Sequence, residues 1–294
     1  MEQTMNHPAI ATATASARRG ESSIGALLLE SGKITPESAE RVLRMQKELG
    51  IRFGEAAVRL GLITEADIQQ VLARQFDYPY LQHGEAGYSK QLVAAYEPFS
   101  PQVETLRAIR SQLMLRWFAR GHKALAIVGM NPGDGASMFA ANLAVVFSQL
   151  GEQTLLVDAN LRKPGQHAIF DLKGAQGLSD LLAGRAELDA VARIASFVDL
   201  SVLPAGTLPP NPQELLSRES FGALNTQFAS RYDVVLYDVP AAVTASDMYA
   251  VAARAGGVFV VARKDKTVVA DVHAMQEQLR QSGAEIVGSV MVDF

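Results

Sequence analysis

The chain has 294 residues, of which 48% are hydrophobic and 20% charged, and its formal net charge is −4 at pH 7. This composition is typical of a globular protein with one large or two modest domains, and it lacks the basic excess of a general nucleic-acid binder. The absence of cysteine excludes disulfides and thiolate metal sites. No apolar run approaches the roughly 18 residues that span a bilayer. We therefore expect a cytoplasmic protein that reaches a membrane only through a partner, with no nucleic-acid partner.

The N-terminal third contains a tail and an internal repeat. Residues 1–22 have no apolar core like that of a signal peptide, and we interpret them as a flexible tail. Residues 23–46 and 52–75 then align as two units of equal length, separated by "KELGI". In each unit a threonine precedes a helical pattern, with an acid shortly after it, which predicts helix N-capping. The capping pairs are Thr35 with Glu37 and Thr64 with Asp67. Each unit therefore predicts a helix, a glycine turn and a capped second helix, within a domain over 23–82.

The remaining chain changes pattern twice. Residues 83–101 mix aromatic, proline and polar residues without a period, and we interpret them as a linker that partly packs on a neighbour. From 102 to 294, apolar strand-like runs alternate with helical patterns. The predicted strands are residues 124–130, 154–159, 200–205, 234–239, 257–262 and 286–292. Strands separated by helices predict a doubly wound parallel sheet in an α/β domain.

The stretch "GMNPGDGASM", Gly129 to Met138, links the first of these strands to a helix. This layout is typical of a phosphate-binding loop, in which small residues let backbone N–H groups approach phosphates at a helix N-terminus. Gly133 and Gly135 suit that cradle, and Ser137 suits a Mg²⁺ ligand. Such loops carry lysine immediately before the Ser or Thr, where this chain has Ala136. The predicted nucleotide-binding residues are Gly133, Asp134, Gly135, Ala136, Ser137, Met138 and Arg162.

Two aspartates end other predicted strands. Asp158 follows "LLV" and Asp238 follows "VVLY". Because ligands of open α/β sheets bind at the carboxyl ends of the strands, both carboxylates are placed to hold Mg²⁺ or its water. We expect Ser137, Asp158 and Asp238 to form the metal site, and the two aspartates to be catalytic if the protein is active.

From about Val103 onward the chain resembles the bacterial tyrosine autokinases of exopolysaccharide synthesis (BY-kinases), especially the EpsG-type chain-length-determinant kinases. The resemblance rests on "PGDGAS", "LLVDANLRKP", "YDVVLYDVPA" and the stretch from Gly206 to Leu216. It implies a P-loop fold, Mg-ATP or Mg-ADP as cofactor, and an inner-membrane chain-length determinant protein as partner. Glu104, Arg107 and Arg110 match the family's E-x-x-R-x-x-R motif, which implies a homo-oligomer.

The departures from the family pattern fall on the chemistry. Ala136 replaces the loop lysine, and Asn160 replaces the second aspartate of D-x-D. The resemblance implies a C-terminal tyrosine cluster, whereas the last tyrosine of this sequence is Tyr249. We favour a catalytically impaired regulator of exopolysaccharide synthesis or export, whose kinase-like fold binds nucleotide weakly or not at all. The alternatives are an active autokinase, in which Arg162 or Lys163 replaces the lysine, and a scaffold without a ligand.

The N-terminal repeat resembles the MshEN class, the N-terminal module of type II secretion and pilus ATPases. Some members of that class bind cyclic di-GMP through tandem motifs of this length. The residues that the resemblance implies are Ile24, Gly25, Gly32, Gln46, Arg52, Phe53, Gly54, Gly61, Leu62 and Gln75. The first unit departs by having Ser23 in place of arginine. We favour cyclic di-GMP binding, and the alternative is a protein-docking module of the same shape.

Overall fold

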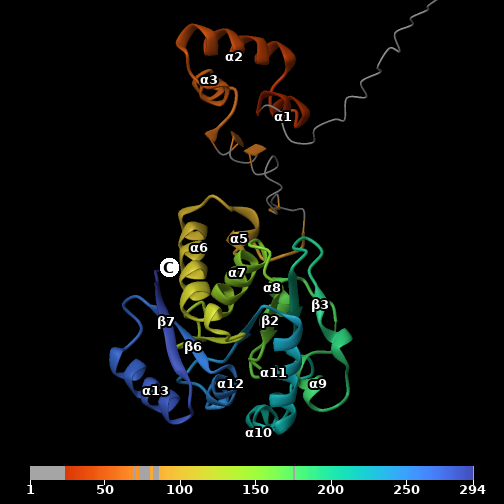
Figure 1. Ribbon diagram of the computed structural model, residues 1–294, viewed down its shortest axis with the longest axis vertical. Coiled ribbons are helices and arrows are strands. Elements are labelled where there is room, and N and C mark those ends of the chain that lie inside the picture. Colours follow the sequence, from red (N-terminus) through yellow and green to blue (C-terminus); the bar gives the residue numbers. More distant parts are fainter. Residues whose placement is uncertain are drawn as a thin grey trace, which may run out of the picture. The chain divides into compact units, whose positions relative to one another are not determined.

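The computed structural model describes residues 24–65, 67–68, 71–72, 80–81, 86–174 and 176–293 of the chain. The chain divides into two compact units between Tyr78 and Pro79 (Figure 1). Within the described residues, no helix combines the length and apolar character that a membrane crossing requires.

The first unit contains helices α1 (Ile24–Glu30), α2 (Pro36–Leu49) and α3 (Phe53–Arg59). They enclose a small apolar core whose fully buried members include Leu28 and Val42. The predicted order of helix, glycine turn and second helix is confirmed for the first repeat.

Both predicted helix caps of this unit are formed. The hydroxyl of Thr35 accepts a hydrogen bond from the backbone N–H of Ser38. The residue that bonds to Thr35 is therefore Ser38 and not the predicted Glu37. In the second repeat, Asp67 accepts from the N–H of Thr64 at 2.8 Å, and the hydroxyl of Thr64 accepts from the N–H of Asp67 at 3.2 Å. This reciprocal pair is a capping box, which satisfies two backbone donors at a helix start.

The second unit is built on a seven-stranded sheet in the order β3-β4-β2-β5-β1-β6-β7. The strands are β1 (Ala124–Gly129), β2 (Thr154–Asp158), β3 (Ala192–Arg193), β4 (Leu200–Leu203), β5 (Val234–Asp238), β6 (Gly257–Arg263) and β7 (Glu285–Val292). All neighbours pair in parallel except β3 and β4, which are antiparallel. The six predicted strands are confirmed, and β3 is an addition of two residues that the sequence analysis did not predict.

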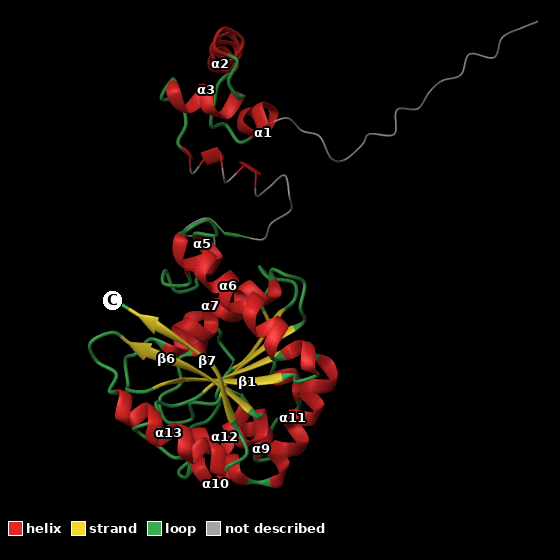
Figure 2. Ribbon diagram, turned by 60° about the vertical axis from the view of Figure 1, so that its left-hand side comes forward, coloured by secondary structure: helices red, strands yellow, loops and turns green. Residues whose placement is uncertain are grey.

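Helices cover both faces of this sheet (Figure 2). On one face α5 (Val93–Tyr96), α6 (Pro101–Arg116) and α7 (Ala136–Ser148) pack against alternate strand residues such as Leu125 and Ile127. On the other face α9 (Leu178–Leu182), α10 (Pro212–Ser217), α11 (Glu219–Arg231), α12 (Asp247–Ala255) and α13 (Val269–Gln281) pack against the intervening ones. The short helices η1 (Phe118–Arg120), α8 (Gln166–Ile169) and η2 (Leu188–Ala190) lie in connections. Burial on both faces explains why the strands appear in the sequence as continuous apolar runs.

Part of the segment interpreted as a linker lies in the core of the second unit. Leu92, Ala94 and Ala95 have no exposed surface. The backbone of Ala94 is held by a side chain of α7 and by one that directly follows this helix: its N–H donates to Asn142 Oδ1 at 2.8 Å, and its carbonyl accepts from Gln149 Nε2 at 3.0 Å. The four residues of α5 are too few to show a period, so only these tertiary contacts define them.

Candidate nucleotide-phosphate site

Three functional segments meet at one edge of the sheet. The strands β2, β5 and β1 are neighbours in that order, and Asp158 stands opposite Asp238 in their register. Because the strands are parallel, their carboxyl ends and the loop after β1 share an edge. A cleft of about 390 Å³ lies there. All seven residues predicted to bind nucleotide line it: Gly133, Asp134, Gly135, Ala136, Ser137, Met138 and Arg162.

The loop after β1 has the backbone of a phosphate cradle. Gly133 (φ 90°) and Gly135 (φ 79°) both adopt the left-handed conformation that favours glycine. The carboxylate of Asp134 accepts from the N–H of Asn131 at 2.7 Å and closes the loop on itself. The 13-residue helix α7 begins at Ala136, so its unpaired first-turn N–H groups and its dipole favour an anion. This cradle fits phosphate oxygens.

The cationic side chains around the cleft differ in availability. Ala136 supplies only a methyl group at the position where phosphate-binding loops carry lysine. Arg162 is committed elsewhere, because Nε and Nη2 bond both oxygens of Asp247 at 2.5 and 3.0 Å, and Asp247 is 1% exposed. This bidentate pair raises the pKa of Arg162, chiefly through the hydrogen bond to Asp247. Lys163 also lines the cleft, and its ammonium has no bonded partner among the described residues.

Asp158 organises the loop that follows β2. It is fully buried, and its Oδ2 accepts from the N–H groups of Gly165 and Gln166, both at 2.9 Å. Its Oδ1 accepts from the N–H of Asn160 at 3.2 Å. The amide of Asn160, in turn, accepts from the N–H of Lys163 at 3.1 Å. Both carboxylate oxygens of Asp158 thus accept hydrogen bonds from backbone N–H groups. These contacts fix the conformation of the loop after β2.

Asp238 faces the phosphate loop. Its Oδ1 accepts from the hydroxyl of Ser137 at 3.0 Å, and its Oδ2 accepts from Nε2 of Gln166 at 2.7 Å. Mg²⁺ typically takes one or two protein oxygens and completes its shell with phosphate and water. Among the described residues no group of three acidic, histidine or cysteine side chains could hold a metal. The Ser137–Asp238 pair fits a magnesium ion that arrives with a nucleotide, and it fits a lone metal poorly.

Burial controls the charge of the aspartate pair. Loss of hydration raises the pKa of Asp158, against the lowering effect of its three N–H donors. Burial also raises the pKa of Asp238, and the neighbouring charge of Asp158 raises it further. Two buried carboxylates side by side disfavour double ionisation. A divalent cation at this edge would therefore favour the ionised forms.

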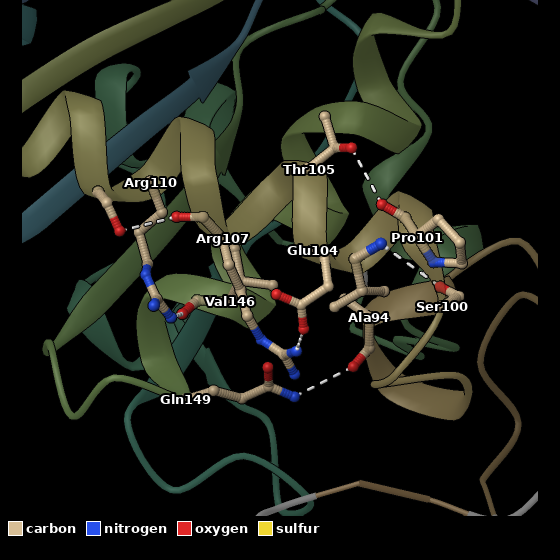
Figure 3. A network of polar contacts seen from close by, with 11 residues as sticks. Ala94, Ser100, Pro101, Glu104, Thr105, Arg107, Arg110, Val146 and Gln149 are labelled. Carbon is tan, nitrogen blue, oxygen red and sulfur yellow. Dashed lines mark hydrogen bonds and ion pairs between the residues drawn. The ribbon is translucent and has the colours of Figure 1, made fainter. Parts of the chain in front are cut away.

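The predicted oligomerisation residues lie along α6, next to α7 (Figure 3). Arg107 forms an ion pair with Glu104 within the chain. Arg110 donates from Nη1 to the carbonyl of Val146 at 2.7 Å. Val146 belongs to the last turn of α7, where carbonyls lack helical partners, so Arg110 caps that helix. Whether these residues also join copies of the chain stays a prediction.

Two glycines predicted to bind cyclic di-GMP have packing roles. A Cβ on Gly25 would lie 3.2 Å from the ring of Phe53. A Cβ on Gly54 would lie 2.9 Å from Ile68 and 3.7 Å from Ile24. Because side chains from the two repeats approach these positions so closely, the glycines allow the helices of the unit to pack against each other.

The other predicted cyclic di-GMP residues are spread over turns and surface. Gly32 and Gly61 occupy matching turns with the same φ of 67°. Arg52 is exposed and precedes α3, and Leu62 packs on the small core. Gln46 lines an open pocket with Leu43, Lys47, Gly50 and Ile51. Gln75 lies outside the described residues.

Comparison with known proteins identifies the family. Residues 122–287 match the family model described as cellulose biosynthesis protein BcsQ. Over 202 residues the chain is 33% identical to tyrosine-protein kinase YwqD of Bacillus subtilis, covering 69% of this chain and 85% of YwqD. The chain belongs to the bacterial tyrosine-kinase (BY-kinase) family. This confirms the resemblance on which the sequence interpretation relied.

Two further relatives of this BY-kinase family member differ in how much of their own length the match covers. The tyrosine-protein kinase wzc of Salmonella typhimurium is 33% identical over 201 residues, but the match spans only 28% of wzc. The solved kinase domain of the Escherichia coli tyrosine kinase ETK superposes with a TM-score of 0.68 at 29% identity, covering 74% of this chain and 85% of that one. The P-loop-type α/β fold is thereby confirmed, whereas the likeness of residues 23–75 to the MshEN class stays a prediction.

Sequence reasoning missed several residues of the site. Gln166 is the first residue of α8 and lies next to the cleft. Asp247 binds Arg162, and Arg263 donates from Nη1 to the carbonyl of Gly133 at 3.4 Å. Asp247 and Arg263 lie more than 80 residues along the chain from their partners. No local spacing marks any of the three, although the position of Gln166 just after Pro164 and Gly165 is typical of a helix start.

Proposed function

We propose that this protein is a nucleotide-binding regulator of exopolysaccharide biosynthesis or export whose kinase-like domain is catalytically impaired. The observation that carries the proposal is Ala136 in the first turn of α7, with the neighbouring Arg162 committed to Asp247. The family model for cellulose biosynthesis supports the polysaccharide context. An inner-membrane chain-length determinant protein is the partner we propose, because the resemblance to EpsG-type kinases implies one.

The residues that line the cleft provide some, but not all, of the groups that would bind Mg-ATP or Mg-ADP. The backbone of Gly133 to Ser137 would hold phosphate oxygens, and Ser137 with Asp238 would hold the magnesium ion. The bound nucleotide would supply the phosphoryl group and the cation its charge. What the chain lacks is the ammonium that reaches the terminal phosphates in the P-loop.

The missing charge is large enough to affect both binding and turnover. Two unit charges about 4 Å apart interact by about 4 kcal/mol at an effective dielectric constant of about 20. Since each ~1.4 kcal/mol corresponds to about tenfold in rate, the loss of the lysine costs roughly a hundredfold or more in phosphoryl transfer. If the protein is instead an active autokinase, Lys163 at the cleft wall is the residue best placed to offset part of this loss.

Calorimetry of the full-length protein tests the proposal. Mg-ATP and Mg-ADP are titrated into the wild type, Ala136→Lys and Ala136→Gln, the last of which adds length without charge. We expect Ala136→Lys to bind at least about tenfold more tightly than both other proteins. Phosphotyrosine is then measured by mass spectrometry after incubation with Mg-ATP. Accumulation on the wild type that stops in Asp158→Ala would establish an active kinase and refute the impairment.

A second candidate function belongs to the first unit, and it is cyclic di-GMP binding. The open pocket at Gln46 favours it, because this predicted ligand residue lies beside an apolar side chain, Leu43, that could cover a base. The exposed Arg52 supplies a guanidinium for phosphate or for stacking on guanine. A protein-docking module of the same shape is the competing interpretation.

A further inference from the structure

Gln166 connects the three segments that form the cleft edge. It is the first residue of α8 and has no exposed surface. Its backbone N–H donates to Asp158 at 2.9 Å, and its side-chain Nε2 donates both to Asp238 Oδ2 at 2.7 Å and to the carbonyl of Ser137 at 3.0 Å. One residue therefore bonds the ends of β2 and β5 and the start of α7.

The orientation of this amide is determined by its neighbours. Nε2 faces a carboxylate oxygen and a backbone carbonyl, and a carbonyl can only accept a hydrogen bond. Turning the amide over would bring Oε1 against both oxygens. In the observed orientation Oε1 is buried without a hydrogen-bond donor among the described residues. Buried polar atoms are seldom left in this way, and an aliphatic side chain of similar size would avoid it. The position thus uses the two N–H donors of Gln166.

These donors control how Asp238 meets the phosphate loop. Because Gln166 holds Oδ2, the carboxylate cannot rotate, and Oδ1 stays directed at the hydroxyl of Ser137 at 3.0 Å. The only proton of that hydroxyl then points at Asp238, which leaves its lone pairs for the cleft that Ser137 lines. A hydroxyl in this state is prepared to bind a cation.

We propose that Gln166 is a positioning residue for the divalent cation that accompanies a nucleoside phosphate, acting through Asp238 and Ser137 from beneath the cleft. This inference rests on the proposed nucleotide site and adds to it the residue that orients its metal ligands. Partners of metal ligands typically change metal affinity by about 10- to 100-fold when they are removed. The effect of Gln166 should therefore appear only where the cation contributes to binding.

The first test compares nucleotide affinity with and without the cation. Fluorescent ADP is titrated into the full-length Ala136→Lys protein in excess Mg²⁺ and in EDTA, with and without Gln166→Leu. We expect Gln166→Leu to lower the ratio of the two affinities by about tenfold and to leave the affinity in EDTA unchanged. Gln149→Leu is the matched control, since it removes a glutamine amide at the far end of α7 that bonds Ala94. It should leave the ratio unaltered, and an unaltered ratio in Gln166→Leu overturns the proposal.

A second variant needs no nucleotide and covers the case that Gln166→Leu does not fold. Gln166→Glu keeps the shape but sets a third carboxylate against Asp238 and the carbonyl of Ser137. We expect its melting temperature to rise with Mg²⁺ far more than that of the wild type, because a cation must replace the lost N–H donors. No added dependence on Mg²⁺ overturns the positioning role. A gain in Gln166→Glu without nucleotide binding by any variant refutes the proposed function and the nucleoside phosphate as the companion of the cation, whereas the action of Gln166 on Asp238 and Ser137 is retained.

Discussion

Asp158 and Asp238 stand side by side at the ends of two paired strands, but their hydrogen bonds differ in kind. Among the described residues, Asp158 accepts only from backbone N–H groups of its own loop. Asp238 accepts from two side chains, Ser137 and Gln166, that come from other elements. The sequence interpretation treated both as equivalent metal ligands. The contacts instead favour Asp238 as the residue that responds to a bound cation.

The raised pKa values of this pair predict a pH dependence of magnesium binding. Since burial raises the pKa of both carboxyls above the usual value, the folded protein without ligand retains a proton there at pH values at which a free aspartate is ionised. Its stability accordingly falls as pH rises above about 4. A cation must displace that proton, so the affinity of Ala136→Lys for Mg-ADP should rise with pH, by up to about tenfold per pH unit for each proton released. Calorimetry at about pH 6 and pH 8 measures this, and Asp238→Asn should flatten the slope. An affinity that is constant or falls would contradict the assignment.

The helix α7 is the element on which the site depends. Its first turn closes the phosphate cradle, its middle holds α5 through Asn142, and its last turn is capped by Arg110 from α6. It is almost completely buried, so its position is determined by these polar contacts and by the apolar layer around it. Changes in the first turn of α7 should therefore act directly on the phosphate loop, whereas changes in its last turn should act mainly on α5 and α6.

Substitutions of two residues of α6 should affect different properties, one the stability of the fold and the other the assembly of copies of the chain. Arg110→Ala removes a charge-assisted bond to Val146, which should lower the free energy of unfolding by about 1–3 kcal/mol. Glu104 is 62% exposed in its ion pair with Arg107. Glu104→Ala should therefore change stability by less than about 1 kcal/mol. If the predicted homo-oligomer uses this motif, Glu104→Ala should also lower the mass measured by light scattering. Urea unfolding provides the stabilities, and equal losses in both variants would contradict the distinction.

At the scale of the whole molecule, the chain pairs a small helical unit with a BY-kinase-like unit. The first unit has its own apolar core and its own helix caps. An ion pair between Lys33 and Asp67 at 2.7 Å joins its two repeats. This bond is the main cause of the lowered pKa of Asp67, about 2. The repeats thus form one structural unit, which a bound ligand or a docked protein could use as a whole.

We predict that the helical unit adds cyclic di-GMP binding to the kinase-like unit. Titration into the full-length protein should show binding at tens of micromolar or tighter, about −6 kcal/mol or better. Arg52→Ala should weaken it by about tenfold or more, since a charge-assisted contact is worth about 1.5–3 kcal/mol. Arg59→Ala is the matched control, as Arg59 is an exposed arginine that pairs with Glu55 within α3. Absence of binding at these concentrations would favour the protein-docking interpretation.

Several features could be determined from the sequence alone because they depend on neighbours along the chain. The six long strands follow from apolar runs that are buried on both faces, and the cap formed by Thr64 and Asp67 follows from two residues three positions apart. The phosphate loop follows from its glycines and from the strand and helix that flank it. The family follows from motifs that each occupy a few consecutive residues.

Only the tertiary structure decided which side chains meet. Ser137 and Asp238 are 101 residues apart in the chain, Gln166 and Asp238 are 72 apart, and Arg162 and Asp247 are 85 apart. The position of α5 likewise depends on Asn142 of α7 and on Gln149, which directly follows that helix. A hydrogen bond is determined by distance and direction in space, and neither quantity is encoded in residue spacing once the chain has turned through a sheet. For this reason the sequence could indicate a phosphate site, whereas the fold alone showed that Arg162 is occupied and that Gln166 holds Asp238.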